Sequence, residues 1–179
     1  QATLPSGKIV AVQTERFVSI VNDEIGALSY SITPINFSGS IEICSYLDFD
    51  VENEDSNYDE KFWESVSCGQ ENGTSCVHAK TKKTGFEVRV AMRNSSTVDG
   101  AAVAWDSTTE ATHMYVCECA TFDVPQGQSL QLNKFAAVLS SMNHDVASLD
   151  GKAAERATEA AAQGYEALQG EHATAWHKK

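Results

Sequence analysis

The chain has 179 residues, of which 13 are basic and 25 acidic, so its formal net charge at pH 7 is −12. This excess of negative charge repels nucleic acid and anionic membrane surfaces, whereas a neutral sugar is indifferent to it. No apolar run approaches the roughly 20 residues that span a bilayer. We therefore expect a soluble protein of one domain with an appendage, which binds neither nucleic acid nor membrane.

The first 135 or so residues alternate in the way β-strands do. Between residues 86 and 93 the even-numbered side chains are apolar, and most odd-numbered ones are charged. Similar runs occur at 9–12, 17–20, 28–32, 41–47, 101–105, 114–122 and 130–138, with turn residues such as Asn72-Gly73 and Asp99-Gly100 between them. Many short strands at this spacing predict a mainly β fold, an antiparallel β-sandwich over residues 1–148.

Composition changes after Asp150, where alanine and glutamate dominate and proline is missing as far as residue 176. These residues favour a helix, capped at its start by Ser148 or Asp150 and weakened by about 1 kcal/mol at each of Gly164 and Gly170. Its apolar stripe consists of Ala157, Ala161, Tyr165, Leu168 and Trp176. The stripe packs either on the sandwich of the same chain or on a further domain.

The cysteines are odd in number and lack the spacing of a disulfide framework: Cys44, Cys68, Cys76, Cys117 and Cys119. We therefore expect free thiols in a reducing cytoplasm. On a strand Cys117 and Cys119 would share one face without being placed to bridge easily. A zinc site built from Cys68, Cys76, His78 and Cys117 or Cys119 lacks a usual ligand spacing, so we expect no metal and no cofactor.

Residues 47–64 alternate acidic with apolar side chains and then become rich in aromatic ones. Tryptophan and tyrosine rings stack on sugar C–H faces, while carboxylates and amides bind sugar hydroxyls. The candidates for binding a carbohydrate or a partner are Asp55, Asn57, Tyr58, Asp59, Trp63 and Trp105. Alternatively, Trp63 is a packing residue and the carboxylates only solvate the loop. No pair of carboxylates is singled out as catalytic.

The same segment resembles the N-terminal domain of the inverting disaccharide phosphorylases of glycoside hydrolase family 65. The resemblance continues through residues 14–19, 28–36 and 132–141, and it closes on His172 and Trp176, which are similar to the family's His-x-x-x-Trp. His144 matches family sequence near the end of the sandwich, where we read it as a hydrogen-bonded junction residue. Phe49 stands where the family would have glycine, and the hairpin around Cys68 and Cys76 is not a family feature.

The resemblance implies that residues 149–179 are a helical linker toward an (α/α)6 barrel, which carries the general acid and the phosphate site. No residue of this chain would then be catalytic, and the chain alone would be inactive. The whole enzyme would cleave an α-linked glucosyl disaccharide with inorganic phosphate, both bound through the barrel, and give β-glucose 1-phosphate with inversion. A homodimer is possible. The alternatives are a free-standing carbohydrate-binding module and a structural oligomerisation domain.

Overall fold

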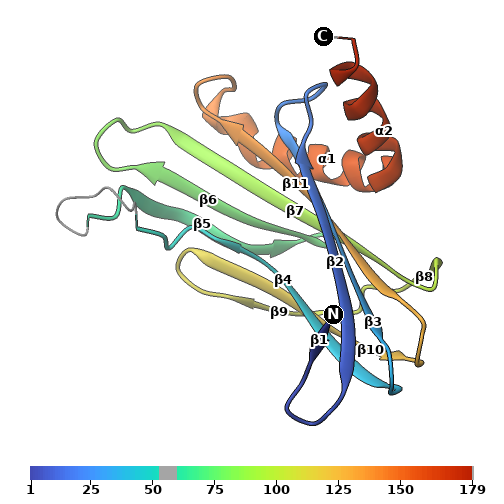
Figure 1. Cartoon of the computed structure of the whole chain (residues 1–179). Coiled ribbons are helices and arrows are strands. Elements are labelled where there is room, and N and C mark those ends of the chain that lie inside the picture. Colours follow the sequence, from blue (N-terminus) through green and yellow to red (C-terminus); the bar gives the residue numbers. More distant parts are fainter. Residues whose placement is uncertain (53–59, 179) are drawn as a thin grey trace.

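Two antiparallel sheets and a pair of helices make up three layers of the computed structural model, which describes residues 1–52 and 60–178 (Figure 1). Sheet A has the order β1-β2-β3-β11-β7-β6-β5, with β8 beside β7, and sheet B has the order β4-β10-β9. The strands of sheet A are β1 (Ala2–Thr3), β2 (Ile9–Val18), β3 (Ile25–Pro34), β5 (Trp63–Glu71), β6 (Thr74–Thr81), β7 (Glu87–Val98), β8 (Ala101–Val103) and β11 (Leu130–Ser140). Those of sheet B are β4 (Gly39–Asp48), β9 (Thr108–Ala111) and β10 (Tyr115–Val124), and the helices are α1 (Val146–Gln163) and α2 (Tyr165–Trp176). The predicted mainly β sandwich followed by C-terminal helix is confirmed.

Tight turns join neighbouring strands where the sequence has Asn-Gly or Asp-Gly. Asn72 and Gly73 have φ values of 51° and 72°, and Asp99 and Gly100 have 50° and 80°. Positive φ at both central residues matches the right-handed twist of the flanking strands, which is why these dipeptides favour two-residue hairpins. The expected strands at 9–12 and 17–20 are wrong in one respect, because they form one continuous strand, β2.

Sheet A is covered on one face by the helices. Small and apolar side chains of α1 and α2 pack on residues of β3, β6, β7 and β11, and the buried members are Ile25, Ala27, Cys76, Ala91, Phe135, Ala137, Leu139, Leu149, Ala153, Ala157, Ala160, Tyr165 and Leu168. Ala161 packs against the same cluster, whereas Trp176 is 55% exposed. Four of the five predicted stripe residues therefore pack against the sandwich of the same chain. That these helices also lead into a further domain stays a prediction.

The helix differs from its expected form at its start and near its middle. It begins at Val146, and Asp145 is its N-cap without a side-chain capping bond, so the cap predicted at Ser148 or Asp150 is wrong. The Ser148 hydroxyl donates to the Asp145 carbonyl within the first turn, and the Asp150 carboxylate turns toward sheet A. Gly164, at φ 87° and ψ 158°, separates α1 from α2. No helix in the described ranges is long and apolar enough to cross a membrane.

The opposite face of sheet A packs on sheet B. The buried side chains between the sheets are Leu47, Val77, Val88, Val90, Met92 and Val116, with Phe49, Trp63, Cys68 and Phe86 partly buried beside them. This confirms the face predicted for residues 86, 88, 90 and 92. The charged face opposite is also covered, because Glu87 and Arg89 lie on the helix side near His78 and Asp150.

The prediction that all five cysteines are free thiols is wrong for two of them. Cys44 and Cys119 are directly opposite in the β4–β10 register, their Cα atoms lie 4.1 Å apart, and their sulfur atoms form a disulfide. Cys68, Cys76 and Cys117 are free. The pairing depends on strand register, which the spacing of cysteines in the sequence does not reveal. The inference from cysteine number to free thiols therefore fails for this pair, and the reducing compartment stays a prediction.

Candidate functional site: a groove between the sheets

A groove of about 620 Å³ opens between sheet A and the edge strand β4. It exists because sheet B has three strands and leaves the β2–β3 side of the larger sheet uncovered. Apolar side chains form most of its walls, and tyrosines, a lysine, a glutamate and a serine supply polar groups. The lining residues are Leu28, Tyr30, Ile32, Ile41, Glu42, Ile43, Cys44, Ser45, Tyr46, Leu132 and Lys134.

Lys134 reaches from β11 across the space between the sheets. Its ammonium group donates a hydrogen bond to the backbone carbonyl of Tyr46 on β4 and lies 5.9 Å from the centre of the Tyr46 ring. Burial lowers the pKa of Lys134, while electrostatic interactions with Glu118 and Cys117 act in the opposite direction. The groove therefore has a cationic group at its wall in a protein that is strongly acidic overall.

Glu118 on β10 is the centre of a buried polar network beside this lysine. Its carboxylate, which is 2% exposed, accepts hydrogen bonds from Ser75 Oγ at 2.5 Å, Asn94 Nδ2 at 2.9 Å and Trp105 Nε1 at 2.6 Å. Asn94 Oδ1 in turn accepts from Ser45 Oγ at 2.9 Å. Three donors satisfy a buried carboxylate and fix it in place, so Glu118 joins four strands and a loop.

Sequence reasoning missed both Lys134 and Glu118, although a signal was present. On β10 the inward residues are even-numbered, so Glu118 interrupts an apolar series between Val116 and Ala120. On β11 Lys134 likewise stands between Leu132 and Ala136 on the face toward sheet B. A charged residue at an inward position of a strand marks a buried polar site, because such burial requires a partner.

Four of the predicted binding residues lie outside the described residues: Asp55, Asn57, Tyr58 and Asp59. Trp63 is half-buried at the start of β5, where its ring meets Phe49 and Phe86 edge-on at centroid distances of 5.9 and 5.7 Å. Its indole is thus part of the packing between the sheets. A role for Trp63 in binding sugar stays a prediction.

Trp105 follows β8 and is held by its bond to Glu118 and by a tilted contact with Phe122 at 6.0 Å. The structure therefore ties the two candidate tryptophans to different partners. Sugar binding by Trp105 also stays a prediction.

Two histidines, His144 and His78, have local structural partners. His144 Nε2 lies 2.5 Å from Glu24 Oε1, so the expectation of a hydrogen-bonded junction residue is confirmed. The ring nitrogens of His78 face Glu87 Oε2 at 2.9 Å and Asp150 Oδ1 at 3.4 Å. His78 thus links sheet A to α1, and its contacts are carboxylates.

The groove offers little for acid–base cleavage of a glycoside. Such chemistry requires two carboxyl groups on opposite sides of the bond that breaks. Glu42 is the one carboxylate among the described residues that line the groove, and it is exposed. Glu118 already accepts three hydrogen bonds. The geometry therefore suits binding or structural support rather than catalysis.

Comparison with known proteins identifies relatives of this chain. The chain is 30% identical over 177 residues to maltose phosphorylase of Bacillus subtilis (strain 168), and the alignment covers 96% of this chain and 22% of the relative. It is 28% identical over 175 residues to α,α-trehalose phosphorylase of Thermoanaerobacter brockii, and this alignment covers 93% of this chain and 22% of the relative. The chain thus spans only 22% of the length of these curated relatives.

A solved structure provisionally named as a kojibiose phosphorylase from human microbiome has the same fold. Its TM-score is 0.78 over 91% of this chain and 20% of that chain, at 13% identity. The family described as glycosyl hydrolase family 65, N-terminal domain, matches residues 1–179. Since that match covers the whole sequence, the chain belongs to the N-terminal domain family of glycosyl hydrolase family 65.

Proposed function

We propose that this chain is the non-catalytic N-terminal sandwich of an inverting disaccharide phosphorylase of carbohydrate metabolism. The observation that carries the proposal is the family match over every residue of the chain. The two curated relatives, which are named for phosphorolysis of maltose and of trehalose, give it further support. The lack of a facing carboxylate pair among the described groove residues agrees with a supporting role.

In the whole enzyme, inorganic phosphate would cleave an α-linked glucosyl disaccharide and give β-glucose 1-phosphate with inversion. The general acid and the phosphate site would lie in an (α/α)6 barrel beyond residue 179. The sandwich would contribute to the position of that barrel and to a homodimer. In this proposal the substrate could be maltose, kojibiose, trehalose or nigerose, because the barrel and not the sandwich decides between them.

The test compares the purified chain with the full product of its gene. Each protein is incubated with phosphate and one of the four disaccharides, and glucose 1-phosphate is measured. We expect release by the full product on at least one disaccharide and none by the chain above a control without protein. Activity of the isolated chain would contradict the non-catalytic role, and inactivity of both would contradict the phosphorylase assignment.

The groove supports a second candidate function, in which the sandwich itself binds sugar. Its volume of about 620 Å³ is within the range of small-molecule sites, and Tyr30 and Tyr46 offer rings beside polar groups. Calorimetric titration of the chain with the same disaccharides tests this candidate. Binding that Tyr30→Ala abolishes would support it, whereas binding unchanged by that substitution would place the sugar elsewhere. Sedimentation of the chain would test the homodimer.

The cytoplasmic location also stays part of the proposal, and the Cys44–Cys119 disulfide provides its test. Cells are quenched in acid, free thiols are alkylated, and the state of both cysteines is read by mass spectrometry. In a cytoplasmic protein we expect both to be alkylated, because thiols there are kept reduced. A protected pair would contradict that location.

A further inference from the structure

Three cysteine sulfur atoms meet on the outer face of sheet B. Cys44 and Cys119 are directly opposite across β4 and β10, and Cys117 lies two residues before Cys119. The three Sγ atoms lie within 4.8 Å of one another, and those of Cys117 and Cys119 are 3.6 Å apart. Across residues 1–52 and 60–178, no other group of three or more His, Cys, Asp or Glu side chains is this close.

The alternation of the strand places this cluster on the side of β10 opposite the Glu118 network. Val116, Glu118 and Ala120 are buried toward sheet A, so the odd-numbered cysteines point outward. Cys44 is exposed, Cys119 is half-buried and Cys117 is 7% exposed. A small solute can therefore reach the cluster from solvent at Cys44, while Cys117 is shielded.

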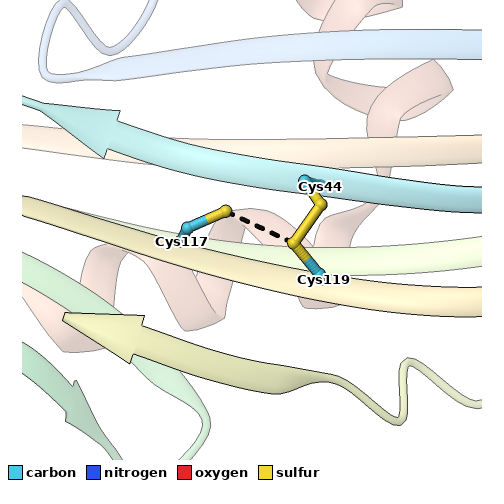
Figure 2. Close-up of side chains that lie close together, drawn as sticks. All are labelled: Cys44, Cys117 and Cys119. Carbon is cyan, nitrogen blue, oxygen red and sulfur yellow. Dashed lines mark hydrogen bonds between the residues drawn. A yellow bond between two sulfur atoms is a disulfide. The ribbon is translucent and has the colours of Figure 1, made fainter.

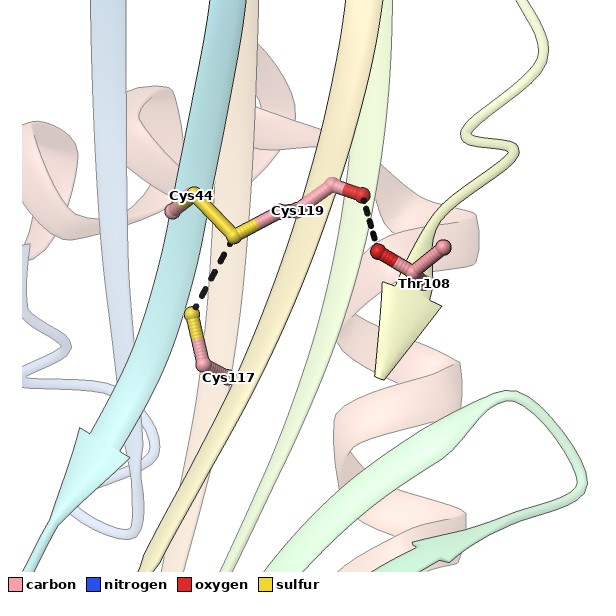
Figure 3. The surroundings of a disulfide bond; sticks show 4 residues. All are labelled: Cys44, Thr108, Cys117 and Cys119. Carbon is pink, nitrogen blue, oxygen red and sulfur yellow. Dashed lines mark hydrogen bonds between the residues drawn. A yellow bond between two sulfur atoms is a disulfide. The ribbon is translucent and has the colours of Figure 1, made fainter. Parts of the chain in front are cut away.

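The three sulfur atoms form a triangle rather than a line. In Figures 2 and 3 the Cys117 sulfur lies to one side of the Cys44–Cys119 bond, and it is within 4.8 Å of the Cys44 sulfur. Thiol–disulfide exchange proceeds by attack of a thiolate on a disulfide sulfur along the axis of the bond that breaks. A thiol beside that axis is poorly placed for attack, but it is well placed as the third ligand of a shared cation.

We propose that, once the disulfide is reduced, Cys44, Cys117 and Cys119 bind one Cu(I) ion as three thiolates. A metal–sulfur bond of about 2.3 Å places the sulfurs of a planar trigonal site about 4 Å apart. The Cys117 and Cys119 sulfurs, at 3.6 Å, are already close to this spacing, and those of Cys44 and Cys119 move apart once their bond is reduced. Thiolate ligands select Cu(I) and zinc among biological metals. Zinc usually takes four protein ligands in structural sites, and the cluster supplies three.

The surrounding charge is mixed, because the Lys134 ammonium interacts with Cys117, but acidic groups outnumber basic ones. Glu110 on β9 is directly opposite Cys117, and the chain as a whole carries a net charge of −12. An acidic surface raises the local concentration of cations. The proposal therefore rests on the soft thiolate ligands, with the acidic chain as a secondary contribution.

The Cys44–Cys119 disulfide prevents metal binding at this site, because it removes two of the three thiolate ligands. Two equivalents of a small thiol reduce the Cys44–Cys119 bond, supply two electrons and two protons, and become a disulfide themselves. The cluster then holds three thiols, which release three protons as Cu(I) binds as a tris-thiolate. In the oxidised chain only the Cys117 thiol of the cluster remains. Metal binding is thus possible only after reduction.

The test uses the full chain in both redox states. The chain is reduced with dithiothreitol, desalted without oxygen and titrated with acetonitrile-stabilised Cu(I) against a chromophoric Cu(I) chelator. We expect one Cu(I) per reduced chain and no comparable binding by the chain with its disulfide intact. Equal affinity in both states would overturn the proposal, and so would a reduced chain that loses the Cu(I) completely to the chelator or to Zn(II).

Alkylation identifies the ligands. In the Cu(I)-loaded reduced chain we expect Cys44, Cys117 and Cys119 to be protected from a thiol reagent, while Cys68 and Cys76 react as they do without metal. Protection that falls mainly on Cys68 or Cys76 would place the ion elsewhere and overturn the assignment.

Matched substitutions provide the second measurement. Cys117→Ser removes one proposed ligand without altering the disulfide, and we expect at least a roughly 100-fold loss of Cu(I) affinity, since even outer-shell partners of metal ligands contribute 10–100-fold. Cys68→Ser, at a free thiol on β5, should leave the affinity unchanged. Circular dichroism is used to check that both variants fold. If a folded Cys117→Ser variant keeps its affinity, the three-thiolate site is wrong.

Discussion

The two faces of sheet A are covered in opposite ways. On the helix face, alanines of α1 and two larger side chains of α2 pack closely on Phe135, Ala137 and Leu139, and the contact is closed. On the face toward sheet B, the packing includes the buried Glu118 network and ends in an open groove beside Lys134. Small residues let a helix approach the sheet, whereas an incomplete second sheet leaves apolar and polar groups near water. Closed packing thus contributes stability, and the open face offers room for binding.

The largest expected difference between the faces comes from two residues of the same strand. Phe135→Ala removes a ring that is 0% exposed on the helix face and should cost about 3–5 kcal/mol, because it leaves a closed cavity. Leu132→Ala on the groove face should cost about 2 kcal/mol, since the open groove reduces the cavity term. Urea unfolding measures both. Equal losses would show that the two faces are packed alike.

The Glu118 network should be the main source of stability on the groove face. Glu118→Ala leaves the donors of Ser75, Asn94 and Trp105 without their acceptor, and we expect a loss of about 3 kcal/mol. Glu118→Gln keeps an acceptor oxygen and should lose about half as much. Chemical unfolding with tryptophan fluorescence follows both variants. If Glu118→Ala loses no more than Glu118→Gln, the hydrogen bonds contribute little.

Trp63 decides whether the aromatic residues of this face pack or bind. Because its ring contacts Phe49 and Phe86 but is only half-buried, Trp63→Ala should cost about 2 kcal/mol, below the 3–5 typical of a fully buried ring. Thermal unfolding and disaccharide titration are measured together. An unchanged midpoint with loss of sugar binding would instead assign Trp63 to a binding surface.

Lys134 gives the groove face a pH dependence. Burial holds its pKa in the folded state below the ordinary value of 10.5. At pH values between this lowered pKa and 10.5, the folded state therefore binds fewer protons than the unfolded state. Stability contributed by this residue therefore rises with pH across that window, and the penalty of burying the ammonium is complete below it. We expect the unfolding free energy of the wild type, relative to Lys134→Met, to increase as pH rises toward 10.5. A difference that falls with pH would contradict the burial of this lysine.

The smallest effect is expected from the ionic contact on the helix face. Asp150 Oδ1 lies 3.2 Å from Arg89 Nε, but the Asp150 side chain is 63% exposed. Asp150→Asn should therefore cost less than about 1 kcal/mol. Glu159→Gln, which breaks the exposed Arg156–Glu159 pair, is the matched control with a smaller loss. A loss above 2 kcal/mol would mean that the ion pair, and not the alanine packing, holds α1 in place.

Local patterns made much of this fold predictable, and long-range register accounts for what was missed. The alternation of residues 86–93 depends only on neighbours in sequence, and so do the Asn72-Gly73 turn and the helix stripe. The Cys44–Cys119 disulfide depends on which strand pairs with β10 and at what offset, which no short motif encodes. The Glu118 network joins strands distant in sequence, so its donors could not be named, although the inward glutamate itself was visible.

The position of β11 affects when sheet A can form during synthesis of the chain. This strand is the last of the strands along the chain, yet it lies between β3 and β7 in the middle of sheet A (Figure 1). During synthesis, the β2–β3 hairpin leaves the ribosome long before its neighbour exists. Its apolar side chains therefore stay uncovered in the meantime, and sheet A can close only when the chain has emerged as far as Ser140. Such non-local pairing slows folding to the order of milliseconds to seconds, and the waiting strands are exposed to aggregation.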